Sequence, residues 1–321
     1  MKKKIMKLIS LTVVLMTAMS LFTVNAAGKL SEYDYSAWTQ IRTQKIDFQN
    51  YAKDEALTAA NKPTNWGFQQ AANGPSKIAE EGGNKYLAVD GYIQLFLEQA
   101  TDNFYAFSAD LKSDGDRNFA MFARAGKEKF TYDTNFSDFY EADRGNVNGG
   151  VVGLGGSGFY VKPFGTKIRL FMKLYDAAQK CKINNVIYDF ETGVDFATGL
   201  HKVTMIDDGL SVSIYVEDSL IAKVAFSEVK KYDIGTEDYY SKAIITKADG
   251  SEVATINNAI ISTKSVVAIG VRNTTVSLDN VQLTEYTAKG VNPGTNDAAV
   301  LSVLLVLAAA SFVLVKRKVN A

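Results

Sequence analysis

The stretch Leu200–Phe226, LHKVTMIDDGLSVSIYVEDSLIAKVAF, decides the fold class of this chain. In its middle part, apolar and polar side chains alternate. One face carries Leu210, Val212, Ile214 and Val216, and the other carries Ser211, Ser213 and Tyr215. A period of two is typical of a β-strand with one buried face. The same apolar alternation recurs at Leu220, Ala222, Val224 and Phe226.

Two turn signals divide this stretch into three strands. The first turn contains Asp208-Gly209, and glycine tolerates the positive φ that tight hairpins need. The second turn is Glu217-Asp218-Ser219. The stretch therefore predicts an antiparallel meander.

The rest of the body repeats this pattern of short strands and turns. Glycine and aspartate clusters separate short apolar segments, and no long helical period appears between residues 45 and 286. Such regular punctuation favours a sandwich or barrel. We expect one all-β domain over residues 45–286, a two-sheet antiparallel sandwich, preceded by a lead-in segment at 28–44.

Both ends of the chain carry export and anchoring signals. Residues 1–27 have a lysine-rich start, an apolar middle and a small-residue exit, which predicts a cleaved signal peptide; an uncleaved anchor is the alternative. Residues 298–315 contain no charge and are long enough to span a bilayer. The basic tail 316–321 would stay in the cytoplasm, so the body would lie outside. Residues 287–297 form a short linker.

Charge and rare residues exclude several classes of function. Without the seven basic residues of the signal and the tail, 28 basic residues face 35 acidic ones, a net charge of −7. An acidic body argues against nucleic acid as a partner. Cys181 is the single cysteine and His201 the single histidine, which excludes an internal disulfide and histidine-rich zinc sites.

The last strand carries one irregularity. Its alternation slips at Asp279-Asn280, between Leu278 and Val281, and a slip by one residue predicts a β-bulge. An aspartate buried at this position would need a partner or a cation.

The C-terminus resembles the sorting signal of Gram-positive cell-wall proteins. The family pattern is Leu-Pro-x-Thr-Gly with Asn-Pro-x-Thr variants, and the matching residues here are Asn292, Pro293, Gly294, Thr295 and Asn296. The resemblance implies that a sortase cuts after Thr295 and joins the protein to the cell wall. A plain membrane anchor is the alternative. Either one places the body outside the cell, on its surface, and the sorting-signal resemblance implies a Gram-positive-type bacterium.

The body resembles the concanavalin A-like lectin and glucanase superfamily, the laminin-G-like jelly rolls. The resemblance rests on three segments: Asp47-Phe48; Gly199–Val203 with Leu210–Val216; and Val267–Arg272 with Val276–Val281. It implies a jelly-roll sandwich that binds sugars, hydrolyses glycans or contacts proteins. It also implies a structural Ca²⁺ held by Asp47 and Asp279, since Ca²⁺ prefers hard oxygen ligands.

Glycan binding is the function we expect from this resemblance. Aromatic rings stack on sugars, and charged or amide side chains bond the hydroxyls. The candidates on polar strand faces are Gln94, Arg124, Arg169, Phe171, Tyr175 and Arg272, and those in loops are Trp66 and Tyr160. The chain would then be a carbohydrate-binding module, lectin or adhesin.

Two other functions remain open. A glycoside hydrolase or lyase needs two facing carboxylates. The glucanase signature Glu-x-Asp-x-x-Glu begins at Glu141-Ala142-Asp143 but has Asn at 146, so enzyme activity is uncertain and less favoured. A structural or protein-binding surface module would need neither a pocket nor a carboxylate pair.

Overall fold

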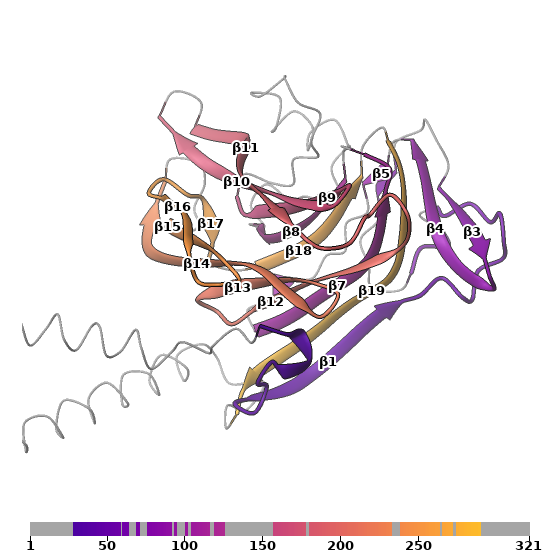
Figure 1. The fold of residues 1–321 in the computed structure, drawn as a ribbon, viewed down its shortest axis with the longest axis horizontal. Helices are drawn as coiled ribbons and strands as arrows, with labels where there is room; N and C mark the ends of the chain where they lie inside the picture. Colours follow the sequence, from indigo (N-terminus) through magenta and orange to yellow (C-terminus); the bar gives the residue numbers. More distant parts are fainter. Residues whose placement is uncertain are drawn as a thin grey trace, which may run out of the picture.

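The computed structural model describes the body of the chain. The described residues are 28–58, 60–63, 69–70, 76–91, 93–94, 100–101, 104–115, 119–125, 157–177, 180–232, 238–263, 265–271 and 274–289. They form a sandwich of two antiparallel sheets, as Figure 1 shows. Among them, the one helical element is a 3₁₀ turn, η1 (Leu30–Glu32). The predicted all-β, two-sheet class is therefore confirmed.

The larger sheet contains the meander and both ends of the described chain. Its strands are β1 (Trp38–Ile46), β3 (Lys77–Glu81), β4 (Asn84–Gly91), β7 (Phe104–Ser113), β12 (His201–Asp207), β13 (Ser211–Val216), β14 (Ser219–Lys231), β15 (Asp238–Lys247), β16 (Glu252–Ile256), β17 (Ile261–Ser262) and β19 (Thr274–Ala288). They are ordered β16-β15-β14-β13-β12-β7-β19-β4-β3, with β1 paired to β19 and β17 to β15.

The smaller sheet lies above it in Figure 1. Its strands are β6 (Ala100–Thr101), β8 (Phe119–Ala125), β9 (Phe159–Phe164), β10 (Lys167–Asp176), β11 (Lys180–Glu191) and β18 (Ser265–Val271). They are ordered β11-β10-β9-β8-β18-β6. A separate short pair joins β2 (Gln69–Gln70) to β5 (Ile93–Gln94).

One hydrophobic core fills the space between the sheets. The larger sheet contributes Phe107, Val203 and Ile214, and the smaller sheet contributes Phe159 and Leu170, all without solvent exposure. Such complete burial of large apolar side chains is the main source of stability for a sandwich.

The meander forms as predicted, with two corrections. Val212, Ile214 and Val216 face the core, and Gly209 turns with a φ of 87°. Leu210 was expected in the core but lies before β13 and is 49% exposed. Leu220 was expected on the core face but packs on the opposite one, because the β13–β14 register shifts between Ile214 and Tyr215.

The expected solvent face of β13 is also buried. Tyr215 has no exposure and packs in a second cluster with Tyr33 and Trp38. These rings come from the segment before and at the start of β1, which covers the outer face of the larger sheet. The prediction of a single buried face was wrong, because the strand pattern alone does not reveal this cover.

The expected lead-in 28–44 in fact contains most of β1. Only Trp38 and Ile46, at the two ends of this strand, are buried. Thr39–Lys45 therefore lacks the apolar alternation that marks a half-buried strand. The strand is held instead by antiparallel pairing with β19. An ion pair between Arg42 and the buried Glu285 adds a side-chain link.

The predicted irregularity of the last strand is confirmed. The β19–β7 register shifts between Asp279 and Gln282, and Asn280 has a φ of 46°. Leu278 and Val281 both reach the core, as the extra residue of a bulge requires.

The two ends of the described chain meet at one end of the larger sheet. The Lys289 backbone N–H donates to the Ala37 carbonyl at 2.9 Å. Lys29 forms an isolated bridge with Ser219. No helix within the described residues is long and apolar enough to cross a membrane. The predicted signal 1–27, the sorting motif Asn292–Asn296, the span 298–315 and the tail 316–321 lie outside those residues.

Candidate functional site

The outer face of the smaller sheet follows from strand alternation in β9 and β10. Phe159 and Val161 point into the core, as do Ile168, Leu170 and Met172. The residues between them therefore point away from the core. On this outer face, cross-strand partners bring Lys162 opposite Arg169 and Tyr160 opposite Phe171.

Three aromatic rings pack across this face, and two of them are stacked. The Tyr160 and Phe171 ring centroids are 4.7 Å apart with planes 12° apart, and Phe122 of β8 lies 4.8 Å from Tyr160. All three rings are buried, with at most 4% exposure. Tyr160 was predicted in a loop, but it belongs to β9. With this burial, Tyr160 and Phe171 support the face from within and offer almost no ring surface to a ligand.

A half-buried ion pair lies beside the stack. Arg169 donates from Nε and Nη2 to the two carboxylate oxygens of Asp189 on β11, at 2.7 and 2.8 Å. Its guanidinium also lies 4.6 Å from the centroid of the Phe164 ring. The side chains of Arg169 and Asp189 are 23% and 30% exposed.

Electrostatics keep this pair charged. The hydrogen bonds from Arg169 are the main reason that the pKa of Asp189 lies below its ordinary value. A bidentate guanidinium–carboxylate pair is rigid and directional. We name Phe164, Arg169 and Asp189 the outer-face cluster.

Tyr175 lies at the other end of β10. Its ring stacks on Tyr232 with centroids 4.5 Å apart, and both side chains are partly buried beside Tyr239 and Ile260. The side-chain amide of Asn258 donates to the Tyr175 carbonyl at 2.7 Å. The structure thus places the predicted residues Arg169, Phe171, Tyr175 and Tyr160 on the same two neighbouring strands.

Arg124 does not belong to this face. Its Nε and Nη2 donate to the carboxylate of Asp207 at 2.6 and 2.5 Å, and its guanidinium lies 4.8 Å from the Phe226 ring centroid. Arg124 is 5% exposed and Asp207 is fully buried. The prediction of a polar surface position was wrong, because Arg124 adopts a φ of 55° that breaks the strand alternation.

The structure does not describe the side chains of the remaining predicted glycan contacts. Trp66 and Arg272 lie outside the described residues, and Gln94 is described only by its backbone in β5. Glu141 and Asp143 of the partial glucanase signature also lie outside the described residues.

The predicted calcium ligands lie on the other side of the sandwich. Asp279 is fully buried and accepts hydrogen bonds from the Asn84 side chain at 2.9 Å and from the Asn280 backbone at 2.8 Å. The Asp47 carboxylate is 41% exposed and pairs with Lys45 at 3.7 Å. Each carboxylate is therefore engaged with its own partners.

The centre of this region holds an amide. Nε2 of Gln49 lies 2.7 Å from the Asp47 carbonyl, 3.0 Å from Oδ1 of Asn84 and 2.9 Å from the Lys85 carbonyl. An amide nitrogen carries only two hydrogens, and here three oxygen acceptors surround it. One of the three acceptors is therefore left without a full hydrogen bond. The two carboxylates as arranged do not fit a shared Ca²⁺.

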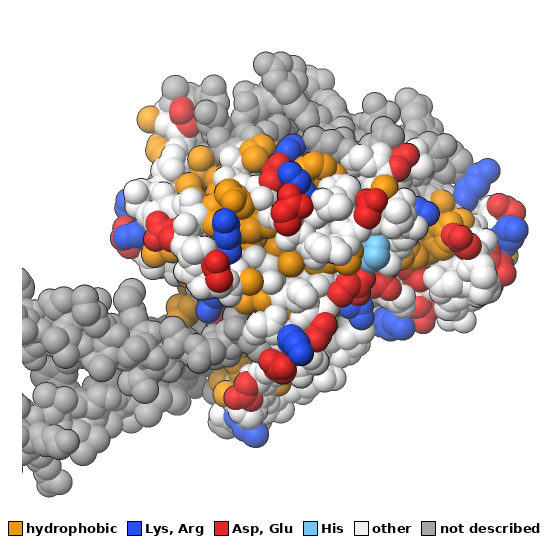
Figure 2. All heavy atoms as spheres, viewed as in Figure 1, with side chains coloured by type: hydrophobic (Ala, Val, Ile, Leu, Met, Phe, Trp, Pro, Cys, Tyr) orange, Lys and Arg blue, Asp and Glu red, His pale blue; other side chains and the backbone are white. Residues whose placement is uncertain are grey.

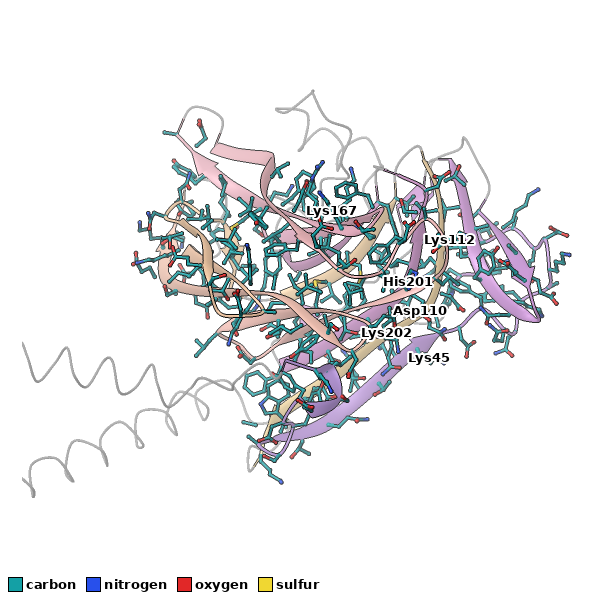
Figure 3. The ribbon with its side chains drawn as sticks, in the orientation of Figure 1. Lys45, Asp110, Lys112, Lys167, His201 and Lys202 are labelled. Carbon is teal, nitrogen blue, oxygen red and sulfur yellow. The ribbon has the colours of Figure 1, made fainter. Side chains whose placement is uncertain are left out.

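Carboxylates crowd this side of the larger sheet, and Figure 2 shows red Asp and Glu side chains gathered directly below the single histidine. Burial, followed by the charges of Asp110 and Asp47, raises the pKa of Asp279 despite its hydrogen bonds. Burial also raises the pKa of Asp110, whose cross-strand partner is Lys202; Figure 3 labels both residues near Lys45. Within the described residues, no group of three or more His, Cys, Asp or Glu side chains is arranged to hold a metal ion. Calcium binding stays a prediction, and it requires the Gln49 amide to move.

Comparisons with known proteins give distant likenesses only. No family model matches the chain, and no curated protein matches it. The carbohydrate-binding module CBM66 from Bacillus subtilis aligns at 14% identity and a TM-score of 0.35, covering 68% of this chain and 96% of that one.

Two other solved structures align over most of the chain. A β-1,3-1,4-glucanase from a mouse hindgut metagenome aligns at 8% identity and a TM-score of 0.36, covering 77% of this chain and 100% of that one. The Emp47p carbohydrate recognition domain aligns at 10% identity and a TM-score of 0.38, covering 79% and 98%. These likenesses are too distant to bear on function, which rests on the site itself.

Proposed function

We propose that this protein is a cell-surface carbohydrate-binding module that holds an extracellular glycan on the outer face of its smaller sheet. The observation that carries this proposal is the outer-face cluster, in which a bidentate Arg169–Asp189 pair lies over the Phe164 ring. Both charged side chains keep partial exposure, so a ligand can reach them.

The cluster combines the two kinds of contact that sugars require. An aromatic ring offers an apolar surface to the C–H face of a pyranose. A guanidinium and a carboxylate held in fixed geometry supply donors and acceptors for hydroxyl groups. The Tyr160–Phe171 stack beside the cluster keeps its backbone rigid, which lowers the entropic cost of binding.

The ends of the chain support a surface location. Export by residues 1–27, membrane insertion of 298–315 and sortase cleavage after Thr295 would leave the sandwich outside the cell, on its wall or membrane. An extracellular glycan would then be within reach. The acidic body would repel nucleic acid, which is not proposed as a ligand.

The test is a binding assay of the purified protein on a panel of insoluble polysaccharides. Retention on the polymer and release of reducing ends are measured on the same samples. We expect retention without release, and a loss of roughly tenfold in affinity for Arg169→Ala, which corresponds to 1.4 kcal/mol. Lys242→Ala is the matched control, because Lys242 pairs with Glu228 at 3.2 Å on the other sheet.

The other outcomes identify the competing functions. Release of reducing ends would show a glycoside hydrolase or lyase and would direct the search to a pair of facing carboxylates. Neither retention nor release on any polymer would overturn glycan binding and favour a structural or protein-binding module. Equal losses of affinity in Arg169→Ala and Lys242→Ala would show that the ligand does not bind at the outer-face cluster.

A further inference from the structure

A second candidate site lies away from the smaller sheet, in the chain that follows β1. Asp47 to Pro63, described except at residue 59, forms a long connection with no strand of its own beyond a single bridge at Ala56. Connections longer than roughly 12–15 residues inside a compact domain usually serve a function.

This connection is ordered by hydrogen bonds to β3 and β4. The backbone N–H groups of Asp54 and Leu57 donate to the carbonyls of Ile78 and Ser76 at 2.8 and 3.0 Å. Nζ of Lys85 donates to the Tyr51 carbonyl at 2.8 Å. The shape of the connection is therefore fixed before any ligand arrives.

Two residues of the connection hold a strained backbone. Phe48 has a φ of 53° and is 1% exposed, and Asp54 has a φ of 63°. A left-handed conformation costs an aromatic residue roughly 1–3 kcal/mol, and such strain collects at functional sites. At Phe48 the strain turns the chain sharply after β1 and directs the ring into the core.

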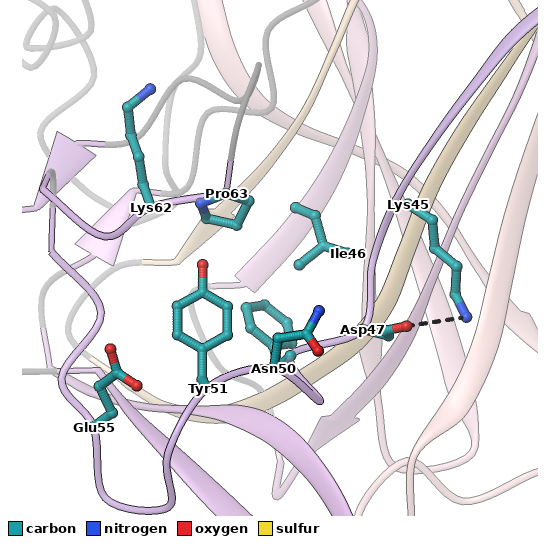
Figure 4. A pocket seen from close by; sticks show the side chains of 9 residues that line it. Lys45, Ile46, Asp47, Asn50, Tyr51, Glu55, Lys62 and Pro63 are labelled. Carbon is teal, nitrogen blue, oxygen red and sulfur yellow. Dashed lines mark ion pairs between the residues drawn. The ribbon is translucent and has the colours of Figure 1, made fainter.

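The turn leaves a hollow of about 360 Å³ (Figure 4). This volume lies within the range of roughly 300–1,000 Å³ that is typical of small-molecule sites. The apolar lining comes from Ile46, Phe48, Tyr51 and Pro63. The Tyr51 hydroxyl donates to the Asn61 carbonyl at 2.8 Å, which fixes the orientation of its ring.

The polar lining contains both signs of charge. Lys45 and Lys62 are basic, Asp47 and Glu55 are acidic, and Asn50 is neutral. Figure 4 shows Tyr51 and Asn50 at the centre, with Glu55 on one side and Asp47 on the other. Glu55 is held in place by the Ala52 backbone N–H at 2.7 Å and the Asn61 side chain at 2.9 Å.

The lining selects a class of ligand. Two acidic and two basic side chains give no net charge, so the hollow does not favour an anion or a cation over a neutral molecule. A tyrosine ring and a proline offer apolar surface, and the polar rim offers donors and acceptors all around. A compact neutral molecule with many hydroxyl groups satisfies both.

We propose that the hollow beside β1 is a binding site for a single neutral monosaccharide unit, with Tyr51 as the stacking platform. The site lies between β1 and β2 in the chain, whereas the outer-face cluster lies on β9, β10 and β11 of the smaller sheet. It goes beyond the proposed function, because neither site needs the other in order to bind.

The test measures monosaccharide binding directly. Glucose, galactose, mannose and N-acetylglucosamine are each added to the purified protein, and saturation-transfer difference NMR detects the bound sugar. Asn50→Trp should fill the hollow, since Asn50 is exposed at its centre. Lys53→Trp is the matched control, because Lys53 is exposed on the same connection but does not line the hollow.

We expect at least one sugar to bind the wild type and Lys53→Trp equally, and to bind Asn50→Trp at least about tenfold more weakly, a difference of 1.4 kcal/mol. Tyr51→Ala, which opens the hollow, should lose the same sugar. This second variant decides the matter if Asn50→Trp unfolds. No binding of any of the four sugars, or equal binding in Asn50→Trp and Tyr51→Ala, would overturn the proposal.

The two sites are separable in this design. Arg169→Ala should keep the monosaccharide signal while losing retention on the polymer, and Asn50→Trp should do the reverse. A loss of both signals in Asn50→Trp with an intact fold would show that the hollow is the glycan site and that the outer-face cluster is not.

Discussion

The Arg124–Asp207 pair joins the two sheets through the core. Arg124 comes from β8 and Asp207 from the end of β12, and Nη1 of Arg124 also reaches the Thr263 carbonyl at 3.1 Å. Burial lowers the pKa of Arg124, but the charge and hydrogen bonds of Asp207 raise it by a larger amount. The pKa of Arg124 therefore lies above its ordinary value. Arg124 thus stays charged inside the protein.

Removing one partner of this pair should be costly. Arg124→Met leaves Asp207 buried without its counter-charge, and we expect a loss of about 3–5 kcal/mol in the free energy of unfolding. Denaturant unfolding measures it. Lys167→Ala, which breaks the exposed Lys167–Glu191 pair, is the control and should cost less than about 1 kcal/mol. Similar losses for both variants would contradict the role of the buried pair.

The amide of Gln49 lies among backbone carbonyl oxygens. A carboxylate in place of its amide would face the carbonyls of Asp47 and Lys85, which attract a cation and repel an anion. Gln49→Glu should therefore lower the midpoint of thermal unfolding in EDTA by about 2–4 °C. Calcium should restore the midpoint of this variant and shift it more than that of the wild type.

A control and a contrary outcome complete this test. Gln40→Ala removes an exposed glutamine of β1 that has one hydrogen bond, to Thr43, and should respond equally to EDTA and calcium. If wild type and Gln49→Glu respond to calcium alike, the amide does not occupy the place of a cation. A large calcium response of the wild type would favour the predicted Asp47–Asp279 site.

Among the elements, the β12–β13 hairpin depends on one glycine. Gly209 has a φ of 87°, and a Cβ at this position would lie 3.0 Å from Cε1 of Phe104. Gly209→Ala should lose about 1–3 kcal/mol of stability, part from the backbone and part from the collision. Gly250→Ala separates the two causes, since its φ is 82° with open space around it. Equal thermal destabilisation in the two variants would exclude the collision.

Strand alternation predicted the elements that have one face in the core and failed where a second layer covers the other. β12, β13 and β14 were found because core side chains, such as Val203, Ile214 and Val224, recur at every second position along each strand. β1 was missed because its interior side chains are polar except for the exposed Ile41, and its partner lies more than 200 residues away in β19. The pairing of distant edges leaves no local pattern.

The same limits apply to the candidate site. Arg169 and Phe171 could be assigned to one face because Ile168, Leu170 and Met172 define the other. Arg124 could not, because a positive φ at one residue inverts the alternation. The hollow beside β1 has no periodic signal, since it depends on hydrogen bonds from the connection to β3 and β4.

In the whole molecule, the first described residues pack against the end of the larger sheet where the last described residues also lie. Ser31 donates from its backbone and its hydroxyl to the carboxylate of Asp218, at 2.7 and 2.9 Å. Tyr33 is 7% exposed and packs on Tyr215 and Trp38. A free N-terminus at Gly28, as signal cleavage predicts, would leave this closure intact.

A truncated chain that begins at Trp38 should therefore be less stable than one that begins at Gly28. It would lose the burial of Tyr33, worth about 1.5–3 kcal/mol, and the backbone bonds to the β13–β14 turn. We expect a loss of about 3 kcal/mol in the free energy of unfolding, measured by denaturant unfolding at pH 7. Tyr239 and Ile260, at the far end of the sheet, should keep their packing. No loss would mean that the segment is not part of the folded unit.

Acid should weaken the hydrogen bonds that hold the N-terminal segment to Asp218. The truncated chain lacks these bonds and should not show this loss. The hydrogen bonds from Ser31 hold the pKa of Asp218 below its ordinary value. A depressed folded pKa gives stability that is present above the unfolded pKa, about 3.9, and is lost as the pH falls towards the folded one. Unfolding midpoints measured from pH 6 to pH 2 should therefore fall more steeply in the intact chain. Other carboxylates, including Asp189 and Asp249, also have lowered pKa values, so both chains should lose stability in acid. The truncation also removes Asp34, whose pKa is lowered by its hydrogen bonds with Ser36, so the difference between the two chains reports on Asp218 and Asp34 together. Asp218→Asn in the intact chain isolates the part due to Asp218, and its midpoint should fall less steeply with acid than that of the wild type. Parallel curves for these two full-length chains would show that Asp218 does not hold the N-terminal segment.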